Sequence, residues 1–252
     1  GFDQLIYIEK ETDQYVPITI FNSDGNEVDA CGNGSRCIIK LLPLIDSKSS
    51  EEYDKNSKKK ISLKTKNRIL TGSLTGKTEV QLDMGKPIFD WNKIPLSKKI
   101  NTRKVDMEID GNKLNFGFCV NVGNPHIIFF NVFNENFDKY FNNLEIIGPK
   151  IENHGLFPEK VNVTFASIVN KEHIFVRVWE RGAGLTKACG TAACATVVAA
   201  YESDLVKKTV TVDFYKNTKE NRGLYINIVP ELENKILMEG PASGPSKIQL
   251  EV

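Results

Sequence analysis

The stretches Ala30-Cys31-Gly32-Asn33-Gly34 and Ala188-Cys189-Gly190-Thr191-Ala192 share one short pattern, an Ala-Cys-Gly followed by a small or polar pair. Each stretch opens an apolar run that is typical of a helix, and one stretch lies in each half of the chain. Alternating and β-branched runs, which are typical of strands, surround both. The repeat therefore predicts a duplicated α+β unit, in which each half has one helix among many strands.

Strand-like runs account for most of the chain, and Gly, Asn-Gly and Pro separate them. Strands are expected at residues 5–8, 16–21, 60–65, 68–74, 79–84, 106–109, 114–120, 127–132, 161–169, 174–179, 208–215, 223–229 and 235–239. Helices are expected at residues 34–42, ending near Pro43, at 192–205, and in shorter runs at 137–141 and 144–153. The helix at 192–205 has small and apolar residues nearly all round, which is typical of a helix enclosed by sheets or by a barrel.

The boundary between the two halves is expected at Asp83-Met84-Gly85-Lys86-Pro87, where a Gly-x-Pro break follows a long strand. A second crossing is expected near Gly240-Pro241, which would return the end of the chain to the first half. These two crossings predict one domain of residues 1–84 plus 239–252 and a second domain of residues 85–238.

Composition argues against several classes of partner. The 252 residues carry a net charge of +1, so no field gathers nucleic acid or an anionic membrane surface. The locally basic residues 54–66 lack the interleaved aromatic side chains that stack on bases. No apolar run has transmembrane length and no export signal is visible, so we expect a cytoplasmic location with reduced thiols.

Metal binding is the other common use of cysteine. Cys31 and Cys37 lie six residues apart, Cys189 and Cys194 lie five apart, and only three histidines exist to help. Neither spacing is that of a zinc knuckle, so no metal site is expected. The chain also shows no phosphate-cradling loop that would argue for pyridoxal phosphate.

Cys31 and Cys189 are the candidate reactive thiols. A cysteine at a helix N-terminus lies near unpaired backbone N–H groups and the positive end of the helix dipole, which lower its pKa. The N–H groups of Gly32-Asn33 and of Gly190-Thr191 suit a carboxylate. Two such helix ends on one carboxylate would stabilise the negative charge that forms when a proton leaves the adjacent carbon.

The alternative is that the cysteines are buried structural residues, which is a common role. That interpretation suits Cys37, Cys119 and Cys194, because they lie inside apolar or small-residue runs. A structural role explains Cys31 and Cys189 poorly, because both lie in Gly-rich turns, where side-chain packing does not require a thiol.

Polar residues near strand ends are further candidates. Asn22 and Asn124 lie at turns, Asn162 lies inside a strand-like run, and Glu180-Arg181 follows the strand that ends at Trp179. Taken singly, an Asn at a turn usually caps the local backbone, and a Glu-Arg pair usually lies on the surface.

Together, these pieces resemble a known family. DACGNGSRC (residues 29–37), GNPH (123–126) and ERGAGLTKACGTAACA (180–195) are similar to the signatures of the diaminopimelate epimerase family. GFDQL (1–5) and FNSDG (21–25) match further segments of that family, so the resemblance covers nearly the whole chain in the right order. Proline racemase and the PhzF-like proteins share the fold but differ in these motifs.

The resemblance implies a two-domain fold in which each half is a strand-rich barrel around a central helix, with the active site in the cleft between the halves. It implies a cofactor-independent isomerase that interconverts LL- and meso-2,6-diaminopimelate, in the synthesis of lysine and of peptidoglycan precursors. Cys31 and Cys189 would be the acid–base pair, one thiolate removing the α-proton and the other thiol delivering a proton to the opposite face. A cytoplasmic homodimer is the expected assembly.

The resemblance also assigns residues around the substrate. His126 and Glu180 would tune the pKa values of the cysteines, and Arg181 would hold a carboxylate in a bidentate way. The residues expected to bind substrate are Gln4, Asn22, Gly32, Asn33, Asn124, Asn162, Glu180, Arg181, Gly190 and Thr191.

The chain departs from the family pattern at several places. A first strand and a GLGNDF-like segment precede the GFDQ stretch in the family, and this sequence starts at Gly1. Leu185 stands where a Glu is usual, and Ala192 stands where a Gly is common.

Two other functions remain open. One is a racemase of another amino acid on the same fold, similar to proline racemase. A substrate with a single zwitterionic end would leave Glu180 and Arg181 unpaired, which argues against it. The other is a non-catalytic binding protein, against which the retention of both cysteines speaks.

Overall fold

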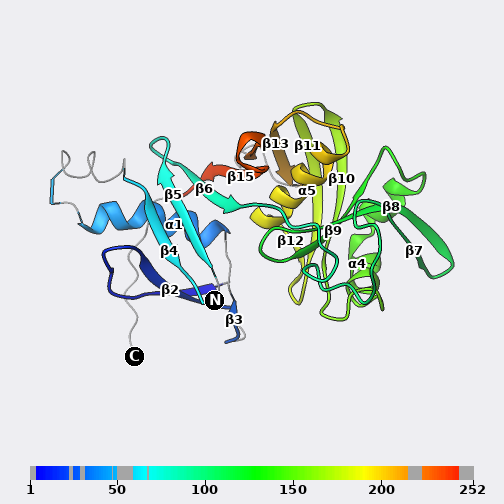
Figure 1. The fold of residues 1–252 in the computed structure, drawn as a ribbon, viewed down its shortest axis with the longest axis horizontal. Coiled ribbons are helices and arrows are strands. Elements are labelled where there is room, and N and C mark those ends of the chain that lie inside the picture. Colours follow the sequence, from blue (N-terminus) through cyan, green and yellow to red (C-terminus); the bar gives the residue numbers. More distant parts are fainter. Residues whose placement is uncertain are drawn as a thin grey trace. The chain divides into compact units, whose positions relative to one another are not determined.

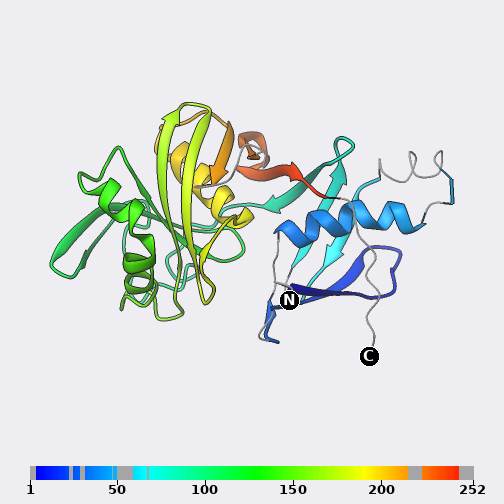
Figure 2. The same ribbon diagram turned by 180° about the vertical axis from the view of Figure 1, so that it is seen from behind.

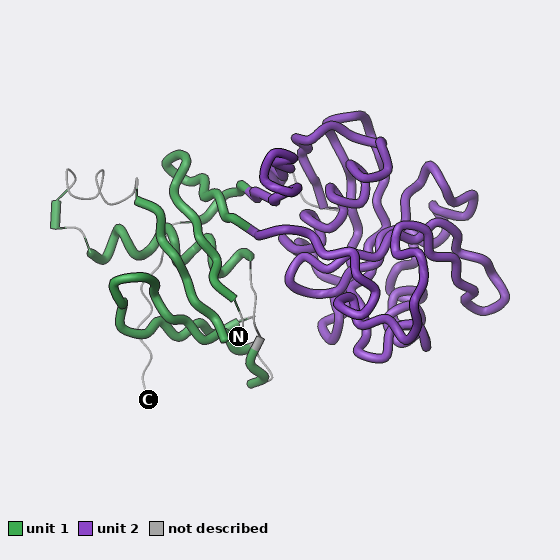
Figure 3. Tube along the Cα trace, viewed as in Figure 1, with its two compact units in different colours: residues 1–83, 239–252 green, residues 84–238 purple. Residues whose placement is uncertain are grey.

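The computed structural model describes residues 4–22, 25–28, 32–46, 48–49, 59–66, 68–214 and 223–243. The chain divides into two units, which Figure 3 colours separately. Unit 1 consists of Gly1–Asp83 and Glu239–Val252, and unit 2 consists of Met84–Met238. The two boundaries fall inside strands β6 (Glu79–Gly85) and β15 (Lys235–Pro241).

Unit 1 is a sheet covered by one helix, α1 (Gly32–Asp46). The sheet follows the order β1-β2-β4-β5-β6, and β3 pairs with β2. All these pairs are antiparallel except β2 with β4. The remaining strand bounds are β1 (Gln4–Ile8), β2 (Val16–Asn22), β3 (Glu27–Val28), β4 (Ile61–Lys64) and β5 (Ile69–Leu74).

The core of unit 1 forms where α1 packs on β5. Ile39 of α1 and Leu70 of β5 are fully buried. A Cβ at Gly72 of β5 would lie 3.2 Å from Ile39 Cδ1 of α1 and 2.7 Å from the Gln81 carbonyl oxygen of β6, so this glycine allows both neighbours to lie close. Apolar side chains therefore specify which face of α1 packs on the sheet, and Gly72 leaves room for that face.

Helix α1 differs from its predicted bounds at both ends. It begins at Gly32 rather than at residue 34, and it continues through Pro43 to Asp46, so the predicted end near Pro43 is wrong. Pro43 lacks an N–H for the Ile39 carbonyl, but its fixed φ is helical and only one helical bond is lost. Leu42 and Pro43 are buried, and this packing keeps the last turn helical.

Unit 2 is a larger sheet with helices on both of its faces (Figures 1 and 2). Its strands follow the order β15-β14-β13-β11-β10-β9-β8-β7, and β12 pairs with β11. The pairs β9–β10 and β11–β13 are parallel. The strand bounds are β7 (Val105–Ile109), β8 (Asn112–Asn121), β9 (Pro125–Phe130), β10 (Asn162–Asn170), β11 (His173–Glu180), β12 (Gly184–Thr186), β13 (Thr209–Phe214) and β14 (Leu224–Val229).

The two faces of this sheet pack against different helices. Ile127, Phe129, Val163 and Phe165 lie in one apolar cluster with residues of α3 (Phe137–Asn142) and α4 (Leu144–Glu152). Side chains alternate along each strand, so the residues between them point to the other face, where α5 (Gly190–Glu202) contacts β8, β9, β10, β13 and β14. A short 3₁₀ turn, Pro230–Leu232, precedes β15.

Helix α5 is the buried centre of unit 2. Every residue from Gly190 to Ala200 is buried, in agreement with the apolar, small-residue composition of the run. The sequence placed its start at residue 192 and its end at 205, and the structure places them at Gly190 and Glu202. Among the described residues, no helix is both long and apolar enough to cross a membrane.

Each predicted strand has a counterpart whose bounds differ by one or two residues at most. The short strands β3 and β12 were not predicted. The α+β fold class predicted from the sequence is confirmed.

Candidate active site

Cys189 immediately precedes α5 and has an extended backbone, with φ −139° and ψ 112°. Its side chain is buried, with 6% of its surface exposed. Its Sγ lies 3.4 Å from Thr191 Oγ1. The backbone N–H groups of the first helical turn, which include those of Gly190 and Thr191, have no acceptor within a helix.

The surroundings of Cys189 keep its thiol protonated. Burial raises its pKa above the usual range, and the nearby Glu180 carboxylate raises it further. The hydrogen bonds from Thr191 and Ala192 act in the opposite direction but are the smaller effect. The sequence-based expectation of a lowered pKa is therefore wrong for Cys189 in this structure, because burial outweighs the helix N-terminus.

His126 is a fully buried, neutral imidazole on β9. Burial and then the Arg181 guanidinium lower its pKa to about 3. Its Nε2 lies 2.9 Å from Asn124 Oδ1, so Nε2 carries the proton and donates it to this oxygen. Within the described residues, Nδ1 has no hydrogen-bond partner. His126 therefore presents a bare nitrogen acceptor in the interior of unit 2.

Asn162 joins two of the sequence motifs. Its Nδ2 donates to the Pro125 carbonyl at 2.8 Å, and its Oδ1 accepts the Arg181 N–H at 3.0 Å. It stands opposite His126 in the parallel pairing of β10 with β9. The buried amide of Asn162 thus fixes the GNPH segment and the Glu-Arg-Gly turn relative to each other.

The turn between β11 and β12 carries Glu180 and Arg181. Glu180 is half-buried and pairs with Gly184 across the turn, whereas Arg181 is exposed and donates from Nη1 to the Glu159 carbonyl at 3.1 Å. The Ala183 N–H donates to the Glu180 carbonyl at 3.1 Å and closes the turn. We call residues 180–184 the ERG turn.

Glu152 was not predicted from the sequence. It is a buried residue at the end of α4, and its two carboxylate oxygens accept the Trp179 Nε1–H at 2.7 Å and the Gly182 N–H at 2.9 Å. Its only sequence signal is an acidic residue directly after the buried Ile151 in the apolar run of α4.

In unit 1, Gly32 and Asn33 are the first two residues of α1. Arg36, which the sequence analysis also missed, donates to Asn33 Oδ1 at 2.9 Å and to the Gly32 carbonyl at 3.4 Å. Its Nε donates to the Pro241 carbonyl at 3.2 Å. Arg36 thereby orders the first turn of α1.

The other unit 1 candidates are placed by the backbone. Gln4 opens β1 and Asn22 ends β2, and the strand register pairs these two residues. Cys31 lies outside the described residues.

The remaining cysteines fall into two groups. Cys119 and Cys194 are buried, and burial raises the pKa of the Cys119 thiol. Cys37 is exposed, so the structural, buried role expected for it is wrong. One helical turn separates Cys37 from the exposed Asn33, and both belong to the exposed stripe of α1.

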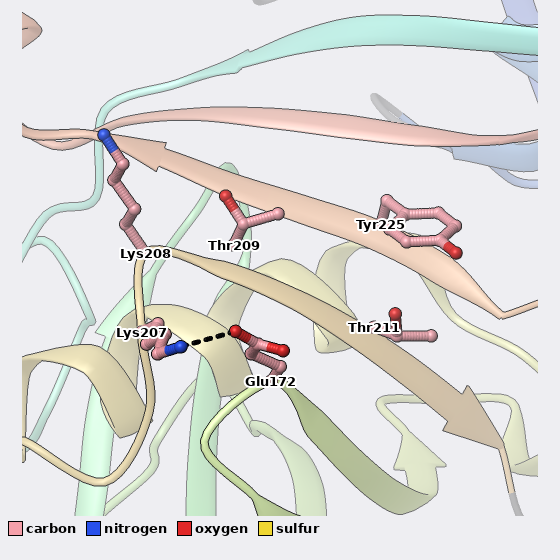
Figure 4. A pocket seen from close by; sticks show the side chains of 6 residues that line it. All are labelled: Glu172, Lys207, Lys208, Thr209, Thr211 and Tyr225. Carbon is pink, nitrogen blue, oxygen red and sulfur yellow. Dashed lines mark hydrogen bonds and ion pairs between the residues drawn. The ribbon is translucent and has the colours of Figure 1, made fainter.

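The described part of the chain contains few other features that could form a site. No group of three or more His, Cys, Asp or Glu side chains there could hold a metal ion. An open pocket lies over β13 and β14, and none of the predicted site residues lines it (Figure 4). Its charged lining includes Lys207, whose Nζ donates to Glu172 Oε1 at 2.6 Å.

Comparison with known proteins identifies one family. A sequence model described as diaminopimelate epimerase matches residues 118–243. The diaminopimelate epimerase of Pelagibacter ubique (strain HTCC1062) is 45% identical over 255 residues, covering 100% of this chain and 85% of the relative. That of Sphingopyxis alaskensis is 42% identical over 212 residues, covering 84% and 70%.

Solved structures extend the likeness of fold. A probable proline racemase from Agrobacterium radiobacter K84 superposes with a TM-score of 0.65 at 13% identity, covering 98% of this chain and 76% of that one. A hydroxyproline epimerase from Agrobacterium vitis superposes with a TM-score of 0.64 at 10% identity, covering 96% and 73%. At these identities the likeness concerns the fold alone.

Proposed function

The chain belongs to the diaminopimelate epimerase family, and we propose that it interconverts LL- and meso-2,6-diaminopimelate by proton transfer between two thiols. The observation that carries the mechanism is Cys189, a buried thiol at the first turn of a helix with Glu180 beside it. Cys31 introduces the matching helix of unit 1, which begins at Gly32.

The reaction inverts one carbon. The thiolate of one cysteine removes the α-hydrogen as a proton, and the C–H electron pair stays on the α-carbon, in conjugation with the carboxylate. The thiol of the other cysteine then delivers its proton to the opposite face. The first sulfur ends as a thiol and the second as a thiolate, so proton and charge balance without any cofactor.

The raised pKa of Cys189 supports a protonated thiol at this position before substrate reacts. In the proposal, Cys189 is therefore the proton donor in one direction, and Cys31 is the base that removes the α-proton. In the reverse direction the roles exchange. The helix N–H groups of Gly190 and Thr191, with those of Gly32 and Asn33, bind the carboxylate next to the reacting carbon and stabilise the charge that develops there.

The distal end of the substrate carries an ammonium and a second carboxylate. In the proposal, Arg181 binds this carboxylate and Glu180 binds the ammonium, helped by Gln4, Asn22, Asn124 and Asn162. Asn162 can serve only with its remaining donor and lone pair, since it already bonds the backbone at Pro125 and Arg181. A cytoplasmic homodimer that needs neither metal nor cofactor completes the proposal.

The test is exchange of the diaminopimelate α-proton in deuterated water, followed by NMR under reducing conditions. We expect exchange with inversion for the native chain, and a loss of roughly 10²–10⁴-fold for Cys31→Ser and for Cys189→Ser. Proline is the contrasting substrate. Exchange of proline but not of diaminopimelate would indicate a different racemase, and tight binding without exchange would indicate a binding protein.

A further inference from the structure

A buried carboxylate links helix α4 to the ERG turn. Glu152 is 5% exposed, and its oxygens accept one N–H from the Trp179 indole and one from the Gly182 backbone. Lys160 Nζ lies 3.8 Å from the same oxygen that accepts from Gly182. A carboxylate buried this far has to be hydrogen-bonded to be tolerated, and here both of its bonds go to β11 and the turn that follows it.

Helix α4 is brought close enough to make these bonds by Gly148. A Cβ at this position would lie 2.6 Å from Trp179 Cγ, so the indole rests directly on the helix backbone. Gly148 and Glu152 are four residues apart and therefore lie on one face of the helix. On this face, the backbone at Gly148 packs against the indole ring, and Glu152 accepts the indole N–H.

The ERG turn is fixed at two consecutive backbone N–H groups. Arg181 donates to Asn162 Oδ1, and Gly182 donates to Glu152 Oε1. Gly182 has φ +74°, a conformation that favours glycine. Two charged side chains extend from this turn. Glu180 raises the pKa of Cys189, and Arg181 lowers the pKa of His126.

We propose that Glu152 is a positioning residue, which fixes the ERG turn through Gly182 and Trp179 and so sets where Glu180 lies relative to Cys189. The proposal rests on the proposed function for the role of Cys189 in catalysis. The placement itself does not depend on turnover. A displacement of the turn would alter the reaction without removing any group that touches the substrate.

The central variant is Glu152→Gln in the full chain. An amide offers one oxygen for two donors, so its NH₂ group must face either the indole N–H or the Gly182 N–H. The control is Glu145→Gln, which changes a carboxylate on the same helix that accepts from Arg177 of β11 at 2.9 Å and makes no bond to the turn. We expect Glu152→Gln to lower kcat/KM for diaminopimelate by roughly tenfold to a hundredfold, and Glu145→Gln to change it less than about threefold.

A second readout needs no catalysis. Iodoacetamide reacts with thiolates, and peptide mass spectrometry resolves the alkylation of Cys189. Since Glu180 opposes ionisation of Cys189, Glu152→Gln should speed this alkylation at pH 8 in the native background and leave it unchanged in a Glu180→Gln background. An equal acceleration in both backgrounds would mean general loosening and would overturn the proposal.

The double variant Glu152→Gln with Trp179→Phe guards against a fold defect. Trp179→Phe removes the indole N–H, which is one of the two donors that compete for the single oxygen of the introduced amide. That oxygen can then accept the Gly182 N–H. We expect the double variant to recover kcat/KM and the native alkylation rate at least in part. Without recovery, the positioning role fails. Absence of diaminopimelate exchange in the native chain, with the alkylation pattern as expected, would instead refute only the proposed function.

Discussion

Helices α1 and α5 both begin at the glycine that follows an Ala-Cys pair, yet they are held in place by different forces. Helix α5 is buried from Gly190 to Ala200, and its small residues let strands approach from several sides. Helix α1 keeps an exposed stripe that includes Asn33 and Cys37. The same short pattern can therefore open a helix that is fixed by packing or one that is fixed by polar contacts.

Two buried cationic side chains make the polar contacts of α1 with the end of the described chain. Arg36 and Lys40 donate to the carbonyls of Pro241 and Ala242, the latter bond being 2.7 Å long. Helix α5 has no charged residue before its last turn, and the hydroxyl of its buried Thr196 has no hydrogen-bond partner within the described residues. The comparison implies that α5 is sensitive to side-chain volume, and α1 to the loss of donors.

The largest effect should come from added volume in α5. Ala195→Leu places three extra carbons at a fully buried position, and overpacking of this kind costs about 3 kcal/mol in the free energy of unfolding. Both tryptophans, Trp91 and Trp179, belong to unit 2, so fluorescence during urea unfolding reports on the unit that contains α5.

The matched change in α1 is Cys37→Leu, at an exposed position. Here we expect a change within about 0.5 kcal/mol, measured by circular dichroism. Comparable losses at the two positions would contradict the contrast between the helices.

The next effect concerns pH. The buried cations of α1 are hydrogen-bonded to carbonyl groups. In contrast, the sheet face that packs against α5 buries His126 as a neutral imidazole, with a pKa of about 3 instead of its ordinary 6.5. The unfolded chain binds this proton below pH 6.5 and the folded chain does so only near pH 3. His126 therefore lowers the free energy of unfolding by about 1.4 kcal/mol for each pH unit as the pH falls between these values.

Urea midpoints of unit 2, followed by tryptophan fluorescence between pH 7 and pH 4, measure this slope. His126→Gln should flatten it while retaining a donor for Asn124. A slope that is the same in the native chain and the variant would show that other groups bind the proton.

The last pair of changes concerns single polar groups, one in each helix. Lys40→Met removes the donor of the Ala242 carbonyl and should cost about 1–2 kcal/mol in the circular dichroism transition, without moving the tryptophan transition of unit 2. Thr196→Val in α5 replaces an unpartnered hydroxyl by a methyl group and should be neutral or stabilising by up to about 1 kcal/mol. If Thr196→Val were the more damaging of the two, α5 would depend on a polar contact after all.

The sequence predicted elements better than it predicted the contacts between them. Strands were found because alternation and β-branching are local signals. The starts of α1 and α5 were placed two residues late, whereas those of α3 and α4 were placed correctly. Pro43 was taken as a stop, although burial of the surrounding turn outweighs the one bond it removes.

The site residues show the same limit. Cys189 stands out through the repeated Ala-Cys-Gly pattern, Asn162 as a polar residue in a strand-like run, and His126 through the GNPH segment. Arg36 and Glu152 are recognised only through distant partners. Arg36 bonds a carbonyl 205 residues away, and Glu152 bonds Trp179 and Gly182 across the α4–β11 interface. The pKa of Cys189 was misjudged for a related reason, because a helix end is visible in sequence and the degree of burial is not.

The return of residues 239–243 to unit 1 bears on the order in which the chain folds during synthesis. All residues of unit 2 emerge from the ribosome before the carbonyls of Pro241 and Ala242 do, so unit 2 can fold while α1 still lacks acceptors for Arg36 and Lys40. Released chains truncated after residue 238 should therefore contain a protease-resistant unit 2 and a protease-sensitive unit 1. The segment synthesised first is completed last.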